Sequence, residues 1–133
     1  MQASVNALVP RYIIIDICLY KRQSFSMRHL PLTGFEWDEG NREKCQTHGV
    51  TLEEVEAFFR QERVYVTPDL PHSQQEHRLL AAGRCPLNGR PMFVVFTLRG
   101  AGDQRRIRPI SARYMHQREA RKYAQEDRTS LHE

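Results

Sequence analysis

Apolar residues along this chain follow two spacings, one typical of a helix and one typical of strands. In residues 51–60, TLEEVEAFFR, they recur at intervals of three and four, which predicts an amphipathic helix with one buried face. Thr51 and Glu54 stand at its start with the spacing of a capping box, in which each side chain binds the backbone amide of the other. We therefore expect this helix to pack its apolar face on a core.

A shorter, polar helix is predicted immediately before it. Residues 34–37, GFEW, are typical of a short strand, and Asp38 is a good N-cap for a helix over 41–47. Gly49 follows His48, and glycine is a natural terminator of a helix. We expect a tight strand-to-helix corner at Asp38.

Four later runs are rich in β-branched and aromatic residues and are separated by turn residues. These predicted strands cover residues 63–69, 76–85, 91–99 and 105–113. The run 91–99 is continuously apolar, so we expect it to be the central, most buried strand. Asn88-Gly89 predicts a hairpin turn before it. Pro109 cannot donate a ladder hydrogen bond, so the last strand should lie at an edge or contain a bulge.

Residues 114–127 have alternating charge and predict a C-terminal helix. The element order is therefore β-α-α-β-β-β-β-α. This order indicates the α+β class: a small antiparallel β-sheet with two N-terminal helices and one C-terminal helix. We assign residues 34–127 to this domain and residues 128–133 to a C-terminal tail.

Residues 1–33 differ from the rest, because their apolar residues do not alternate cleanly. They could form an extra strand or helix, or they could be an N-terminal extension with Met27 as an alternative initiator. We favour the extension, since the predicted domain begins just after Met27. The apolar run 12–20 is far shorter than the roughly 20 residues that a membrane-spanning helix needs. Three isolated cysteines without a CxxC pair argue against a disulfide framework or zinc site and favour a cytoplasmic location.

Composition adds one unusual feature to this ordinary globular balance. Hydrophobic residues make up 40% of the 133 residues and charged residues 27%, and the formal net charge is +4. Of the 20 basic residues, 17 are Arg. Arg makes forked contacts with phosphate that Lys cannot make. A GC-rich genome would also raise the Arg content, so the positions of the arginines must decide between the two explanations.

Many of these arginines fall on the late strands. They are Arg78, Arg84, Arg90, Arg99, Arg105, Arg106, Arg108 and Arg113. Residues two apart in a strand share a face, so Arg106 and Arg108 should project together, and Arg78 could join them if the register allows. Such a face can bind phosphate, or it can be the solvated outer face that antiparallel sheets commonly have.

Histidine and serine positions limit the possible chemistry. No histidine lies in a metal-binding spacing such as HExxH, so we expect no metal and no cofactor. No GxSxG elbow is present, which disfavours acyl hydrolase chemistry. His116, beside Tyr114 and close to Arg113, could exchange protons near a phosphate, although a surface role explains it equally well. Trp37 is expected to be a core residue and Asp38 a helix cap.

Three segments together resemble one family. FEWDEGNREKCQTHGV, PHSQQEHR and RPISARYMHQREARKY are similar, in this order and at similar spacing, to the BrnT toxins of type II toxin–antitoxin pairs. The resemblance covers about residues 34–126. Thr47 replaces the usual Lys before His48, and His77 replaces an acidic residue. Residues 1–33 have no counterpart in the family.

The resemblance implies a RelE-like fold and an endoribonuclease that inhibits translation and growth. It implies that Arg78, Arg108 and Arg113 form a cationic clamp and that Glu54 or His116 transfers protons. Further contacts with RNA are expected at the following residues: Arg99, Arg106, Tyr114 and His48. The expected products carry a 2′,3′-cyclic phosphate and a 5′-OH, because no metal-activated water is expected.

The resemblance also implies a partner. This is a BrnA-like ribbon-helix-helix antitoxin, which would form a heterotetramer with the toxin and bind operator DNA. An alternative is a catalytically weakened domain that still binds the antitoxin or nucleic acid, as the change at Thr47 would allow. A third is a small structural domain whose Arg content reflects genome composition.

Overall fold

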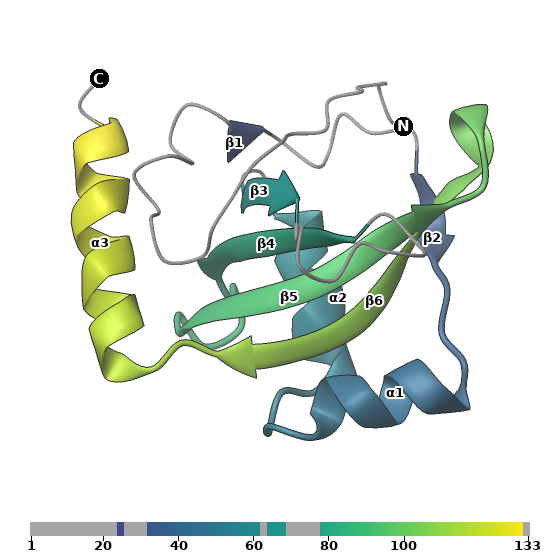
Figure 1. Cartoon of the computed structure of the whole chain (residues 1–133), viewed down its shortest axis with the longest axis horizontal. Coiled ribbons are helices and arrows are strands. Elements are labelled where there is room, and N and C mark those ends of the chain that lie inside the picture. Colours follow the sequence, from purple (N-terminus) through teal and green to yellow (C-terminus); the bar gives the residue numbers. More distant parts are fainter. Residues whose placement is uncertain (1–23, 26–31, 62–63, 69–77, 132–133) are drawn as a thin grey trace.

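The structure is a computed structural model that describes residues 24–25, 32–61, 64–68 and 78–131. Within these ranges six strands form one sheet, and three α-helices surround it (Figure 1). The elements are β1 (Ser24–Phe25), β2 (Leu32–Phe35), α1 (Glu39–Gln46), α2 (Leu52–Arg60), β3 (Val64–Pro68), β4 (Leu79–Arg84), β5 (Pro91–Arg99), β6 (Arg105–Tyr114) and α3 (Gln117–Leu131). The α+β class is confirmed. No helix of the described residues is long and apolar enough to cross a membrane.

The strand order is β1-β3-β4-β5-β6-β2, and one pair departs from the predicted antiparallel sheet. β2 runs parallel to β6, with Phe35 opposite Ile107, whereas the other neighbouring pairs are antiparallel. β2 lies before α1 and α2 in the chain, and β6 is the last strand of the sheet. The last strand therefore pairs with a strand from the beginning of the domain. This pairing brings the start of α1 beside the middle of β6.

The predicted boundaries are close to the observed ones, and the last helix differs at both ends. The strand at 91–99 has the predicted limits. The last helix begins at Gln117 and not at 114, because Tyr114 still pairs with Met92 in the sheet. It continues to Leu131, past the predicted limit at 127. Met27 and most of the predicted extension lie outside the described residues, so the interpretation of residues 1–33 stays a prediction.

Pro109 produces the bulge that its chemistry predicted. Val95 pairs with Ser111 and Phe96 with Pro109, which leaves Ile110 as the extra residue on β6. β6 is not an edge strand, because β2 pairs with its other side. The bulge therefore accommodates the proline within the sheet.

The two faces of the sheet have different covers. One face packs against α1 and α2, and α2 lies behind the sheet in Figure 1. The buried residues on this side include Val55, Phe58, Phe59, Val64, Val66, Met92, Val94, Phe96 and Ile107. On the other face α3 covers one end, where Tyr123 packs with Tyr65, Leu80, Ala82 and Phe93. Arg99, Arg106 and Arg108 also lie on this second face.

Both predicted N-terminal caps are confirmed. Asp38 caps α1 and Thr51 caps α2, each in a reciprocal capping box. Trp37 packs against the core and donates from Nε1 to Glu56 at 2.8 Å. Gly49 has a φ of 91°, a left-handed conformation that suits glycine after a helix.

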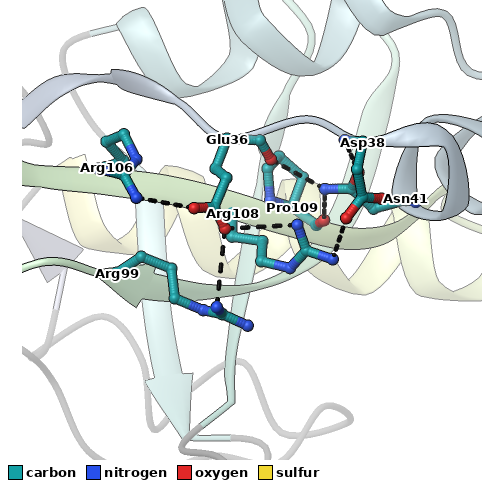
Figure 2. Close-up of polar contacts among 7 residues, drawn as sticks. All are labelled: Glu36, Asp38, Asn41, Arg99, Arg106, Arg108 and Pro109. Atoms are coloured by element: carbon teal, nitrogen blue, oxygen red, sulfur yellow. Dashed lines mark hydrogen bonds and ion pairs between the residues drawn. The ribbon is translucent and has the colours of Figure 1, made fainter.

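The buried amide of Asn41 joins three elements. Its Nδ2 donates to the carbonyl oxygens of Glu36 at 3.0 Å and Pro109 at 2.8 Å, and its Oδ1 accepts from the backbone N–H of Asp38 at 2.7 Å (Figure 2). The end of β2, the start of α1 and the bulge of β6 are thereby held together.

We expect Asn41→Ala to lower the free energy of unfolding by about 2 to 4 kcal/mol, because two carbonyl oxygens lose their donor at a buried position. Urea unfolding measures this loss. Gln46→Ala removes an exposed amide from the same helix and should cost less than about 0.5 kcal/mol. Equal effects of the two changes would contradict a linking role for Asn41.

Candidate functional site

Three arginines converge on one carboxylate on the sheet face opposite α1 and α2. Arg106 Nη2 donates to Glu36 Oε2 at 2.7 Å. Arg108 Nη1 lies 3.4 Å and Arg99 Nη1 lies 3.7 Å from Glu36 Oε1. Figure 2 shows these guanidinium groups around Glu36. We call Arg99, Arg106 and Arg108 the arginine cluster.

Strand geometry produces this convergence. Arg106 and Arg108 are two residues apart on β6 and share a face, as predicted from the sequence. Arg99 is the partner of Arg106 across the β5–β6 ladder. Glu36 directly follows Phe35, which pairs with Ile107, and the Glu36 N–H donates to the Ile107 carbonyl at 2.8 Å. The parallel β2–β6 pairing therefore brings Glu36 to the arginines.

Asp38 forms a second bridge to the cluster. Its Oδ1 caps α1 by accepting from the Asn41 N–H at 3.0 Å, and its Oδ2 accepts from Arg108 Nη2 at 2.9 Å. Arg108 thus forks between Glu36 and Asp38. The predicted cap at Asp38 is confirmed, and the same carboxylate also orients an arginine.

Hydrogen bonds from arginines and from the start of α1 lower the pKa of both carboxylates. The hydrogen bond from Arg106 lowers the pKa of Glu36, and the charges of Arg106, Arg99 and Arg108 add to this against the opposing effect of burial. The hydrogen bond from the Asn41 N–H, and then that from Arg108, lower the pKa of Asp38. Both groups are therefore negative at neutral pH.

The cluster has the chemical properties of an anion site. Three guanidinium groups face two carboxylates, so the local charge is positive. The Arg99 and Arg106 side chains are each 41% exposed and that of Arg108 is 20% exposed, so a ligand can reach them. Arginine forks match the oxygen geometry of a phosphate. An anion that enters here meets preorganised donors and competes with Glu36 for them.

Arg113 and His116 lie at the other end of β6. Arg113 donates to Glu119 from both terminal nitrogens, at 2.8 and 3.1 Å, and its guanidinium lies 5.0 Å from the centre of the Phe93 ring. The backbone N–H of His116 donates to the same Glu119 carboxylate at 2.8 Å. Five residues of strand, about 15 Å, separate Arg113 from Arg108. Arg113 therefore anchors α3 to the sheet at a distance from the arginine cluster.

Glu54 and Tyr114 lie on the opposite face of the sheet. The Tyr114 hydroxyl donates to Glu54, and Asn88 Nδ2 contacts both groups. The Arg90 guanidinium stacks over the Tyr114 ring with its carbon 3.6 Å from the ring centre. Burial and then the hydrogen bond to the Glu54 carboxylate raise the pKa of Tyr114. This group joins α2, the β4–β5 turn and β6.

The other two predicted residues are Arg78, which is level with Arg108 across β5, and His48, which lies apart from the cluster. Arg78 directly precedes β4, and β5 separates β4 from β6, so its backbone is about 10 Å from that of β6. His48 is exposed and follows the C-terminal end of α1, whereas Asp38 and the cluster lie at the N-terminal end. The structure thus brings Arg99, Arg106 and Arg108 together, and the following predicted residues lie elsewhere: Arg113, Glu54, His116, Tyr114 and His48.

Sequence analysis did not identify Glu36 as a site residue. The sequence does contain a pattern that points to it, because Glu36 and Asp38 flank the core residue Trp37. In an extended segment, two residues that flank a core residue both lie on the face opposite to it. What the pattern cannot show is which strand lies beside them. The pairing of β2 with β6 is a long-range contact that local spacing does not encode.

Comparison with known proteins identifies the family. Residues 37–119 match the model of the family described as "Ribonuclease toxin, BrnT, of type II toxin-antitoxin system". A search of curated proteins found no match. The matched segment includes Asp38, Arg99, Arg106 and Arg108 and begins one residue after Glu36.

We expect the fold to lose stability in acid through Glu119. Its hydrogen bond with Arg113 lowers its pKa in the folded state. A carboxyl group with a lowered pKa in the folded state contributes its full stabilisation at a pH above its pKa in the unfolded chain, which is about 4. This contribution is lost as the pH falls below that value. Urea unfolding between pH 7 and pH 3 should show this loss for the wild type. Glu119→Gln should be less stable at pH 7 and should depend less on pH.

Glu126→Gln removes the same charge from α3 and is the control. If Glu126→Gln and Glu119→Gln change the pH dependence equally, the loss comes from net charge and not from the Arg113–Glu119 pair.

Proposed function

The chain belongs to the BrnT family of ribonuclease toxins of type II toxin–antitoxin systems, and we propose that it arrests growth by cutting RNA at the arginine cluster. The observation that carries this proposal is the convergence of Arg99, Arg106 and Arg108 on one exposed sheet face. RNA presents a phosphate at every nucleotide, and the forked guanidinium group of Arg is suited to bind it. We place this activity in the cytoplasm, where RNA is translated.

The reaction that fits this cluster is an internal phosphoryl transfer. The ribose 2′-oxygen attacks the adjacent phosphorus, the P–O5′ bond breaks, and the products are a 2′,3′-cyclic phosphate and a 5′-OH. Negative charge builds up on the phosphoryl oxygens in the transition state. The guanidinium groups of Arg106 and Arg108 are positioned to stabilise this charge. We assign this electrostatic role to the arginines, so the reaction requires no metal ion.

Eight of the residues predicted from the family resemblance divide into three groups in this proposal. Arg108 binds the scissile phosphate, with Arg106 and Arg99 beside it. Arg78 and Arg113 carry positive charge on adjoining parts of the sheet and are proposed to contact the RNA backbone further along the strand. Glu54, Tyr114 and His116 lie outside reach of this phosphate, and we propose that they support the fold around it.

The antitoxin is the second partner. Type II systems pair a toxin with a protein antitoxin, and we propose a BrnA-like ribbon-helix-helix protein that forms a heterotetramer with this chain and carries the operator-binding surface. An acidic antitoxin segment that covers the arginine cluster would block RNA directly. Its carboxylates would take the places that Glu36 and Asp38 occupy on Arg108.

One observation supports the alternative of a weakened toxin. Thr47 stands where the family usually has Lys, and its hydroxyl donates to the Glu43 carbonyl at 3.2 Å. This position carries no positive charge for RNA. A chain weakened in this way would bind RNA or antitoxin without arresting growth, so induced expression of the full chain in bacteria separates the two functions.

We expect Arg108→Ala to abolish growth arrest and to slow RNA cleavage by the purified protein by about 100-fold, because it removes a donor to the developing charge. Arg121→Ala removes an equal charge from the exposed surface of α3 and should change the rate less than twofold. Cleavage should continue in EDTA and should produce 5′-OH ends. Products with 5′-phosphate ends, or a rate that EDTA abolishes, would contradict the proposed reaction.

Antitoxin inhibition provides a separate prediction. If the antitoxin covers the arginine cluster, Arg108→Glu should weaken its binding by tenfold or more, because the new carboxylate repels the acidic segment. Titration of the purified partners, followed by calorimetry, measures this change. Unchanged affinity would place the antitoxin on another surface, and Arg121→Glu is the matched control.

A further inference from the structure

We propose that Glu36 is the general base of the cleavage reaction and removes the proton from the ribose 2′-OH. This inference rests on the proposed function, because it assumes that the scissile phosphate binds at the arginine cluster. It adds a residue that carries the proton transfer and that local sequence features did not single out.

Shared contacts place Glu36 where a base is needed. Its carboxylate uses the same guanidinium groups that would bind the phosphate. A phosphate on Arg108 and Arg99 therefore lies beside this carboxylate. The attacking 2′-oxygen belongs to the nucleotide joined to that phosphate and must approach its phosphorus to within about 3 Å. A base that touches the phosphate ligands is thus within hydrogen-bond reach of the 2′-OH.

One oxygen of Glu36 is well placed to accept a proton. Oε2 receives the short 2.7 Å hydrogen bond from Arg106, which orients the carboxylate. Oε1 has only the 3.4 and 3.7 Å contacts to Arg108 and Arg99, which are longer than a normal charge-assisted hydrogen bond. When a phosphate takes Arg108 and Arg99, Oε1 retains a lone pair for the 2′-OH.

The other carboxylates in this part of the fold are already committed. Asp38 uses one oxygen to cap α1 and the other to accept from Arg108. Glu119 accepts from Arg113 and from the His116 N–H at the far end of β6. Glu54 is on the opposite face, where it accepts from Tyr114 and caps α2.

Charge around Glu36 suits the two stages of the reaction. Among the described residues, the charged groups near it are Arg99 on β5, Arg106 and Arg108 on β6, and Asp38 before α1. The arginines keep Glu36 ionised before RNA binds, so the basic form is present at neutral pH. A bound phosphate brings negative charge and takes arginine hydrogen bonds away. Both changes raise the proton affinity of Glu36 when a proton must be accepted.

Protons and bonds balance along this path. The 2′-O–H proton passes to Glu36 Oε1 as the 2′-O–P bond forms and the P–O5′ bond breaks. The leaving 5′-oxygen takes a proton from water, which reaches this partly exposed face. Protonated Glu36 then returns its proton to the hydroxide left in solution. No oxidant, metal or further reactant enters the step.

The backbone of Glu36 is fixed on both sides, as a base requires. Its N–H donates to the Ile107 carbonyl, and its own carbonyl accepts from Asn41 Nδ2. Asn41 is therefore a positioning residue that acts through Glu36, and Figure 2 shows its contact with the Glu36 carbonyl.

A matched pair of substitutions tests the proposal. Glu36→Gln and Asp38→Asn each remove one negative charge next to Arg108, and Asn still caps a helix as well as Asp. Steady-state cleavage of a mixed-sequence RNA is measured with the full chain, both on free RNA and on ribosome-bound RNA, from pH 4 to pH 9. Thermal unfolding of each variant confirms that it is folded.

We expect Glu36→Gln to lower kcat by about 100-fold or more, with a KM that is unchanged or lower. The wild-type rate should fall on the acidic side as Glu36 is protonated, and Glu36→Gln should lack this fall. Asp38→Asn removes a carboxylate that orients Arg108, so it should lower kcat less than Glu36→Gln does and should keep the acidic fall.

Two results would overturn the proposal in distinguishable ways. Equal losses for Glu36→Gln and Asp38→Asn, with the acidic fall present in both, would reduce Glu36 to an electrostatic partner of the arginines while leaving the ribonuclease intact. A folded wild type that cuts neither free nor ribosome-bound RNA would overturn the proposed function, and the role of Glu36 with it.

Discussion

The arrangement of the site depends on the buried amide of Asn41. This one side chain binds the end of β2, the start of α1 and the bulge of β6 through three hydrogen bonds. Each bond satisfies a backbone group that burial would otherwise leave unpaired, and a buried unpaired group is costly. Glu36 and Asp38 are held on either side of this corner. Their carboxylates therefore reach Arg106 and Arg108 from fixed positions.

The carboxylates and the arginines in this cluster neutralise one another's charge. Three guanidinium groups on one sheet face would repel each other without counter-charge, and Glu36 and Asp38 supply it. The same neutralisation keeps the carboxylates ionised. Because the side chains are partly exposed, solvent screens these pairs and their contribution to stability is small. A ligand with phosphate chemistry can therefore replace a carboxylate at low cost.

β6 divides two kinds of polar network between its faces. Arg106 and Arg108 project to the exposed face, whereas Tyr114 projects to the face covered by α1 and α2 and meets Glu54 there. The bulge opposite Phe96 shifts the register by one residue. Arg113 therefore lies on the same face as Arg106 and Arg108, where it contacts Phe93 and Glu119. A single strand thus supports the arginine cluster and two structural anchors.

Local patterns in the sequence determined most of the elements. Spacing identified the helix at 51–60, the capping boxes followed from Asp38 and Thr51, and the continuous apolar run at 91–99 marked a central strand. These features depend on neighbours three or four residues away, so the sequence displays them directly. The shared face of Arg106 and Arg108 followed from strand alternation in the same way.

Only the tertiary structure decided which of the predicted site residues meet. Arg78, Arg108 and Arg113 look equivalent in the sequence, yet β5 separates the first two and about 15 Å of strand separates the last two. Glu54 lies on the face of the sheet opposite to Arg108 and does not reach it. Glu36, which is about 70 residues earlier in the chain, reaches Arg108 from the end of the parallel strand β2. The sequence by itself determined the elements and the arginines they carry. The site required long-range strand pairing and the Asn41 corner, which arise from packing between distant segments and leave no trace in local spacing.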